Sequence, residues 1–148
     1  MDTPEDAAEL AALPAELSDL LERSNRSFLV TLRADGSPTA HPMTALTQDG
    51  ALMFNTYRSS AKARNVARDA RVSAVYLPPY DQPPRGVLAV RGRGEICGAD
   101  EPPQRRDQGP AVSDSVARRV SERIAAGKRV LIEIHAQRVR PLAPPRKS

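Results

Sequence analysis

Two Asp-Gly pairs, at 35–36 and 49–50, place the strongest limit on the fold of this chain. Each pair separates stretches in which apolar and polar residues alternate. Asp-Gly between such stretches is typical of a tight β-hairpin. We therefore expect three consecutive antiparallel strands at 27–33, 38–47 and 51–56.

The second of these strands contains two prolines, Pro38 and Pro42. Proline has no N–H to donate to a neighbouring strand, so prolines in sheets are confined to edges and bulges. The sequence predicts that this strand lies at an edge of the sheet or carries a bulge near Pro42.

Hydrophobic periodicity predicts the other elements. A helix is expected from Thr3, and Pro14 interrupts it and opens a second helix. On one face of the strand expected at 86–97, Gly92 and Gly94 indicate a bulge or a close approach by another backbone or a ligand. The remaining elements are a helix at 60–68, strands at 71–77, 86–97 and 128–139, and a helix at 112–124. In the helix that opens at Pro14, the residues Leu17, Leu20, Leu21 and Ser24 share a stripe at helical spacing.

Six strands, with hairpins early in the chain, favour antiparallel β-structure over an open parallel sheet. The expected fold is mainly β (α+β), a small six-stranded antiparallel barrel, split or closed, with flanking helices. We expect one domain at 13–140, an acidic segment at 1–12 before it and a disordered tail at 141–148.

Charge is unevenly distributed along the chain. The first 22 residues hold seven acidic and no basic residues, and the rest holds 22 basic against 11 acidic residues, a net charge of +11. A net positive charge of this size is compatible with binding nucleic acid, with binding an anionic cofactor, or with a role in solubility alone. Nucleic acid matches poorly, because aromatic residues make up only 3% of the chain and do not alternate with the cations as base-stacking requires.

Several other classes of protein are disfavoured by the sequence. No apolar run reaches membrane-spanning length and no signal-peptide pattern opens the chain, so we expect a cytoplasmic protein without a membrane partner. Cys97 is the single cysteine, which excludes an internal disulfide. His41 and His135 occur without a metal-binding motif, so no metal site is expected.

The stretch Asn55 to Arg71 is the strongest candidate for a functional site. Its hydroxyls lie where the helix at 60–68 should begin, and it holds five basic residues against one acidic residue. A helix start presents unpaired N–H groups and a partial positive charge, so this stretch predicts an anion site, most naturally for phosphate. Lys62 is placed to reach the ligand and Asn65 shares its face, whereas Arg64 and Arg68 should face solvent. The expected buried stripe is Ala63, Val66, Ala67 and Ala70.

Three segments together resemble the pyridoxamine 5′-phosphate oxidase-like split barrels. They are FLVTLRADGSP at 28–38, ALMFNT at 51–56 and KARNVARDARVS at 62–73. The resemblance covers about residues 16–140, is most specific at K-x-x-N-x-x-R-D, and is closest to the flavin and deazaflavin oxidoreductases. Two departures are Asp69-Ala70, where the family has Asp-Pro, and the absence of aromatic residues around Met43.

The resemblance implies a homodimer with the cofactor in a groove between the subunits. The cofactor would be the deazaflavin coenzyme F420, or FMN as the alternative, and the reaction a hydride transfer with a small organic molecule. The implied cofactor-binding residues are Thr56, Arg58, Ser60, Lys62 and Asn65 at the phosphate, and Pro42, Met43 and Thr44 along the ring. No proton donor stands out, although His41 and Tyr57 are candidates.

Plainer interpretations of these residues stay open. Thr56 and Ser60 could act only as helix caps, and Asn65 could only hydrogen-bond a neighbouring segment. Arg58 could be a solvated arginine, and Arg91 and Arg93 could hold an anionic tail or line an exposed strand. At the level of function, the alternative is a non-catalytic protein that binds or carries a flavin-like cofactor or haem.

Overall fold

The computed structural model describes residues 8–82, 86–97 and 128–142. These residues form two helices and one antiparallel sheet of seven strands in the order β2-β1-β5-β6-β7-β4-β3. In chain order the elements are α1 (Ala15–Arg23), β1 (Arg26–Leu32), β2 (Pro38–Thr44), β3 (Leu46–Gln48), β4 (Ala51–Tyr57), α2 (Ala61–Arg68), β5 (Arg71–Leu77), β6 (Leu88–Cys97) and β7 (Arg129–Pro141).

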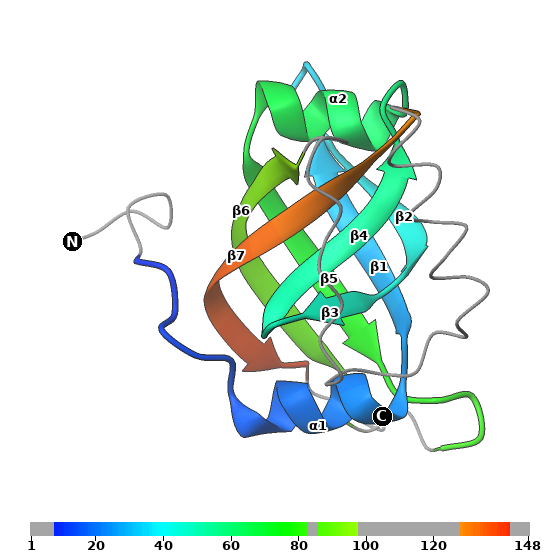
Figure 1. Ribbon diagram of the computed structural model, residues 1–148, viewed down its shortest axis with the longest axis vertical. Helices are drawn as coiled ribbons and strands as arrows, with labels where there is room; N and C mark the ends of the chain where they lie inside the picture. The colour runs from blue at the N-terminus through cyan, green and yellow to red at the C-terminus, as the bar shows by residue number, and fades with distance from the viewer. Residues whose placement is uncertain (1–7, 83–85, 98–127, 143–148) are drawn as a thin grey trace, which may run out of the picture.

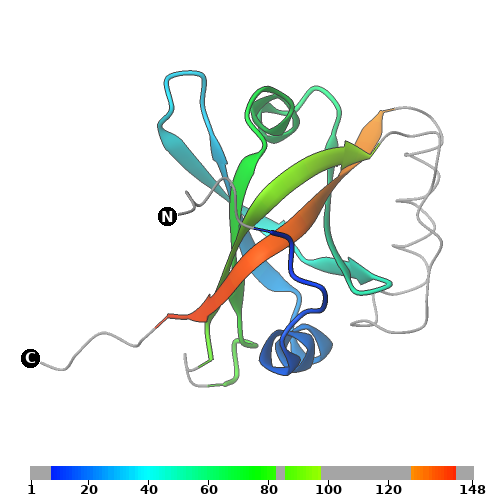
Figure 2. The same cartoon turned by 90° about the vertical axis from the view of Figure 1, so that its left-hand side faces the viewer.

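The sheet curls around an aliphatic core, and the two helices lie at its opposite ends (Figures 1 and 2). Leu20 of α1 and Val66 of α2 belong to the same buried cluster as Phe54 of β4 and Ile132 of β7. Burial of this apolar surface is the main stabilising contribution to the fold. The expected split barrel with flanking helices is confirmed, with seven strands instead of six.

The additional strand arises because the predicted strand 38–47 is interrupted at Ala45. This residue is 1% exposed, and its N–H donates to the Asn25 carbonyl at 2.8 Å instead of joining a strand ladder. The chain thereby leaves β1, the partner of β2, and continues as β3, the partner of β4. The edge position predicted for the proline-containing strand is confirmed, while the interruption falls three residues beyond Pro42.

The second predicted hairpin has the backbone that Asp-Gly favours. Asp49 and Gly50 both have positive φ, 59° and 78°, and they join the paired residues Gln48 and Ala51. Positive φ at both central positions of a two-residue loop is the type I′ arrangement, whose twist matches that of the strands.

The two glycines of β6 serve close approaches, as predicted. The register between β6 and β7 shifts between Arg91 and Gly92, and a Cβ on Gly92 would overlap the carbonyl oxygen of His135. A Cβ on Gly94 would lie 2.9 Å from Cγ1 of Val66. Gly92 therefore accommodates the neighbouring strand, and Gly94 accommodates α2.

The N-terminal predictions are confirmed only in part. Pro14 is the N-cap of α1, and Leu17, Leu20 and Leu21 are at most 3% exposed. Residues 8–14 are not helical, so a helix continuing from Thr3 up to Pro14 is wrong. Leu10 N–H instead donates to the Ala136 carbonyl at 2.7 Å, which holds this segment against β7.

Some predictions fall outside the described residues, namely the helix at 112–124, residues 1–7 of the acidic segment and residues 143–148 of the tail. At the start of that tail, Pro141 is the last residue of β7, and Leu142 N–H donates to the Val87 carbonyl at 2.9 Å. The first two residues of the tail expected at 141–148 are therefore ordered against the barrel.

The inward face of β1 carries Ser27, Leu29 and Thr31, all at most 4% exposed. Phe28 is on the opposite face and is 39% exposed, beside Pro42 of β2 and Val75 of β5 in the sheet register. The outer face of this part of the sheet is consequently apolar, although it borders solvent in the single chain.

Candidate cofactor-binding site

The junction between β4 and α2 is built around the Ser60 hydroxyl. Ser60 is the N-cap of α2, and its Oγ accepts a hydrogen bond from the Ala63 N–H at 3.1 Å. The Thr56 hydroxyl donates to the same oxygen at 2.9 Å. A serine hydroxyl has two acceptor positions and one proton to donate. Because both acceptor positions are used, the Ser60 proton is left to donate to a ligand.

Thr56 and Ser60 therefore differ in what they can offer. Thr56 is 4% exposed and its hydroxyl proton is directed at Ser60. Ser60 is partly exposed and retains its donor. The capping role considered for Ser60 is confirmed, and it is compatible with anion binding because capping uses only the acceptor side of the hydroxyl.

His41 lies within electrostatic range of two basic side chains, Lys62 and Arg33. Burial of His41 lowers its pKa, and the charges of Lys62 and Arg33 lower it further. Lys62 belongs to the first turn of α2, and within the described part of the chain it makes no ion pair. His41 is partly buried, and its Nε2 lies 3.4 Å from Thr39 Oγ1. An uncompensated positive field of this kind attracts an anion.

Arg33 and Thr39 were not singled out from the sequence as site residues. Arg33 follows β1 and Thr39 belongs to β2, so the hairpin between these strands brings both residues towards α2. Alternation along β2 could have indicated Thr39, because it shares a strand face with His41. Nothing in the sequence places that face beside Lys62.

Asn65 is held by bonds within the protein. It is 7% exposed, its amide donates to Thr31 Oγ1 at 3.1 Å, and its Oδ1 accepts from Arg68 at 2.7 Å. Arg68 is exposed, as expected, and it also donates to the Leu32 carbonyl at 3.1 Å. Ala67, expected in the buried stripe of α2, is exposed, and Asn65 is buried beside Val66 instead. Polar bonds to β1 explain why an asparagine is tolerated there.

The three residues proposed to line the cofactor ring do not share a face. Met43 is partly buried against the core, and its carbonyl accepts from the Ser27 hydroxyl at 2.7 Å. Pro42 and Thr44 are exposed on the other face of β2. Only one side of β2 can therefore face a given ligand through its side chains.

The remaining candidates lie at the surface. Arg58 is exposed, and its N–H donates to the Lys128 carbonyl at 3.0 Å. Tyr57 is 50% exposed, with the Arg129 guanidinium carbon 4.1 Å from its ring centroid. Arg91 and Arg93 are exposed on β6. Among the residues that the structure describes, no helix has the length and apolar character needed to cross a membrane.

The sequence model of pyridoxamine 5′-phosphate oxidase matches residues 13–143, which is most of the chain. The chain belongs to the pyridoxamine 5′-phosphate oxidase family. No curated protein matched the sequence.

Several solved structures share this fold. The conserved hypothetical protein Rv2991 of Mycobacterium tuberculosis is 29% identical, with 95% of this chain and 94% of that chain covered and a TM-score of 0.67. A protein named F420 reductase is 24% identical, with coverages of 86% and 98% and a TM-score of 0.63. An FMN-binding protein of Nostoc punctiforme, related to pyridoxamine 5′-phosphate oxidase, is 15% identical, with coverages of 88% and 83% and a TM-score of 0.62.

Proposed function

We propose that this chain is a homodimeric oxidoreductase that uses coenzyme F420, with FMN as the alternative cofactor. The observation that carries the proposal is that the Ser60 hydroxyl accepts two hydrogen bonds and keeps its proton, while Lys62, in the first turn of α2, makes no ion pair with the described residues. Both cofactors carry phosphate, and this donor set fits a phosphate group.

Each residue has a defined part in the proposed site. Ser60 donates its hydroxyl proton to a phosphate oxygen, and the Lys62 ammonium supplies charge on the same side of the helix. Arg33 adds a second positive charge, and Arg58 is the family-implied contact at the end of β4. Burial, and then the charges of Lys62 and Arg33, lower the pKa of His41, which favours the neutral imidazole, and this ring can orient a polar group of the ligand.

When bound, a reduced deazaflavin or flavin supplies hydride, while the protein supplies orientation and electrostatics. F420 is favoured over FMN because it adds an anionic tail, which the net charge of +11 beyond residue 22 would attract. The F420 reductase with the same fold is consistent with this choice of cofactor.

The homodimer is supported by the outer face of β1 and β2. Phe28 is exposed there beside Pro42, and Val30 and Ala40 form the next register pair along the same face. Large apolar side chains that border solvent on a sheet face are typical of an interaction surface. A second copy of the chain would bury these apolar side chains and would form the other wall of the proposed cofactor groove.

Titration of the purified protein with F420 and with FMN, followed by cofactor fluorescence, tests the proposal. Saturable binding of F420, and oxidation of the bound reduced form of F420 when an organic acceptor is added, are the expected results. Tighter binding of FMN would select the alternative cofactor. Tight binding of either cofactor without turnover by any acceptor tried would instead identify a carrier, and binding of neither would refute the cofactor assignment.

A further inference from the structure

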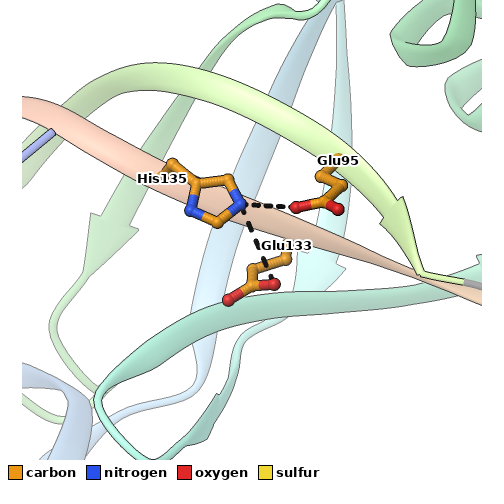
Figure 3. A group of neighbouring side chains, drawn as sticks. All are labelled: Glu95, Glu133 and His135. Atoms are coloured by element: carbon orange, nitrogen blue, oxygen red, sulfur yellow. Dashed lines mark hydrogen bonds and ion pairs between the residues drawn. The ribbon is translucent and has the colours of Figure 1, made fainter. Parts of the chain in front are cut away.

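A cluster of potential metal ligands lies on the outer face of β6 and β7 (Figure 3). Glu133 and His135 are two residues apart on β7, so their side chains leave the same face of the strand. Glu95 of β6 is directly opposite Glu133 in the sheet register. One ligand atom from each of the three residues lies within 4.8 Å of the other two.

We propose that Glu95, Glu133 and His135 bind a first-row divalent transition ion, for which Zn²⁺ is the representative. Imidazole nitrogen together with carboxylate oxygen is a donor set that suits zinc. Three protein ligands leave the fourth coordination position of zinc open for water or another ligand.

A zinc ion bound here would take the place of the proton that His135 Nε2 now shares with Glu95. His135 Nε2 lies 2.8 Å from Glu95 Oε2 and 3.9 Å from Glu133 Oε2. Ligand atoms bound tetrahedrally at zinc are about 3.4 Å apart, as follows from metal–ligand distances near 2.1 Å. Small rotations of the two glutamates reach this spacing, and the Glu95 side chain, 62% exposed, has room to move.

The second nitrogen of the histidine is already oriented. His135 Nδ1 lies 2.9 Å from Glu9 Oε1, and the segment carrying Glu9 is held to β7 by the Leu10 N–H on the Ala136 carbonyl. A metal-binding histidine commonly has a carboxylate on its other ring nitrogen, which sets the tautomer and raises the basicity of the ligand nitrogen. Glu9 is therefore assigned as the orienting residue.

Charge at this position also favours a cation. Two carboxylates directly opposite each other on neighbouring strands repel and destabilise the pair. Glu95 and Glu133 have this relationship, and Glu9 adds a third carboxylate around the same imidazole. Arg93 is opposite His135 in the register, but it lies near enough to Asp69 for its charge to help lower the pKa of that carboxyl. A divalent cation would compensate the carboxylates where they meet.

Sequence spacing alone does not identify this site. Glu133-Ile134-His135 matches no helical zinc motif, and Glu95 is separated from His135 by 40 residues. The register shift between Arg91 and Gly92, in which β7 has one residue more than β6, determines which residues of the two strands face each other. Antiparallel pairing after this bulge brings the three ligands together.

Calorimetric titration of the full-length, tag-free protein with ZnCl₂ tests the proposal, with the melting temperature as a second measurement. We expect one Zn²⁺ per chain and a rise in melting temperature with added zinc. Glu95→Gln and His135→Ala should each weaken binding at least tenfold, and Glu9→Gln should weaken it about tenfold through the orientation of His135. Because Glu95→Gln keeps the size and polarity of the side chain, it remains informative if His135→Ala does not fold.

Two control variants separate this site from other zinc ligands. His41→Ala removes the other histidine of the chain and should leave zinc affinity unchanged. Cys97→Ser should also leave it unchanged, although Cys97 Sγ lies 3.7 Å from Glu133 Oε2. The proposal is overturned if the wild-type protein does not bind Zn²⁺. It is also overturned if Glu95→Gln binds as tightly as wild type, or if binding is lost in His41→Ala or Cys97→Ser alone.

Discussion

The Asn65 amide donates to the hydroxyl oxygen of Thr31 at 3.1 Å, joining the buried face of α2 to β1. Thr31 is 0% exposed and Asn65 is 7% exposed, so neither group can exchange this bond for one to water. The helix that carries the candidate phosphate ligands is thereby held at a defined position over the barrel end.

Replacement of Asn65 by alanine should lower the free energy of unfolding by about 1–3 kcal/mol, because the Thr31 hydroxyl would remain buried without its donor. Urea denaturation measures this loss as a lower transition midpoint. Ala67→Gln, on the exposed face of the same helix, is the matched control and should change the midpoint little. Equal stability of Asn65→Ala and wild type would show that the buried bond contributes nothing.

Lys62→Ala should weaken cofactor binding by about 1.5–3 kcal/mol, the value of a hydrogen bond to a charged group. Arg64→Ala removes the same charge from an exposed position of α2 and should leave affinity close to that of wild type. Fluorescence titration of both variants with F420 and FMN separates a specific contact from general attraction. A similar loss in both would mean that Lys62 is not a ligand.

Asp69 should make stability depend on pH in the acidic range. Hydrogen bonds from the Arg71 side chain, then from the Arg71 N–H, lower the pKa of Asp69 to about 2. Because the unfolded value is about 3.9, the stabilisation is fully present above pH 4 and is lost as pH falls towards 2. The side chains are 28% and 51% exposed, so screening by water limits the contribution to about 0.5–1 kcal/mol.

Denaturation of wild type and Asp69→Asn at several pH values checks this prediction. The difference in free energy of unfolding should be present at pH 6 and should shrink between pH 4 and pH 2. Arg71→Ala, which removes the partner, should show the same trend. A difference that stays constant down to pH 2 would exclude the ionised pair as its cause.

Gly94→Ala should destabilise the protein by about 1–3 kcal/mol, the usual range for overpacking. The added methyl group would lie 2.9 Å from Cγ1 of Val66 and 3.1 Å from Cγ1 of Val72. Val66→Ala removes the nearer of these atoms, so the double variant should be more stable than the sum of the two single effects predicts. Strict additivity in the double-mutant cycle would show that α2 moves away from the added methyl group instead.

Phe28→Glu should convert the proposed homodimer into a monomer, since it places a charge in the apolar outer face of β1. Static light scattering would then report half the wild-type mass. Leu142→Glu, a change of the same kind at another exposed apolar residue, should remain dimeric. A wild-type protein that is already monomeric would refute the homodimer itself.

The hairpins and the edge position of β2 could be predicted because their causes are local. Asp49 and Gly50 have the positive φ that an Asp-Gly pair favours in a two-residue loop, and Pro42 lacks a donor in every environment. The N-cap at Ser60 is likewise determined by its own hydroxyl and the next three residues. These features depend on only a few neighbouring residues.

The faces of α2 and the interruption at Ala45 could not be predicted in this way. Helical spacing favours Ala67 as a buried residue, but Asn65 is buried instead because Thr31 of β1 supplies its hydrogen-bond acceptor. Ala45 leaves the ladder because the Asn25 carbonyl accepts its N–H. In both cases the hydrogen-bond partner is distant in the sequence, and sequence periodicity contains no information about it.

The same division applies to the candidate sites. The sequence by itself indicated the candidate phosphate-binding stretch, because hydroxyls, basic residues and a helix start are contiguous between Asn55 and Arg71. Only the tertiary structure decided that the charges of Arg33 and Lys62 act on His41, and that Glu95 meets His135. Charges on separate strands affect one another over a few ångströms of space, and that separation is fixed by sheet register and curvature, not by distance along the chain.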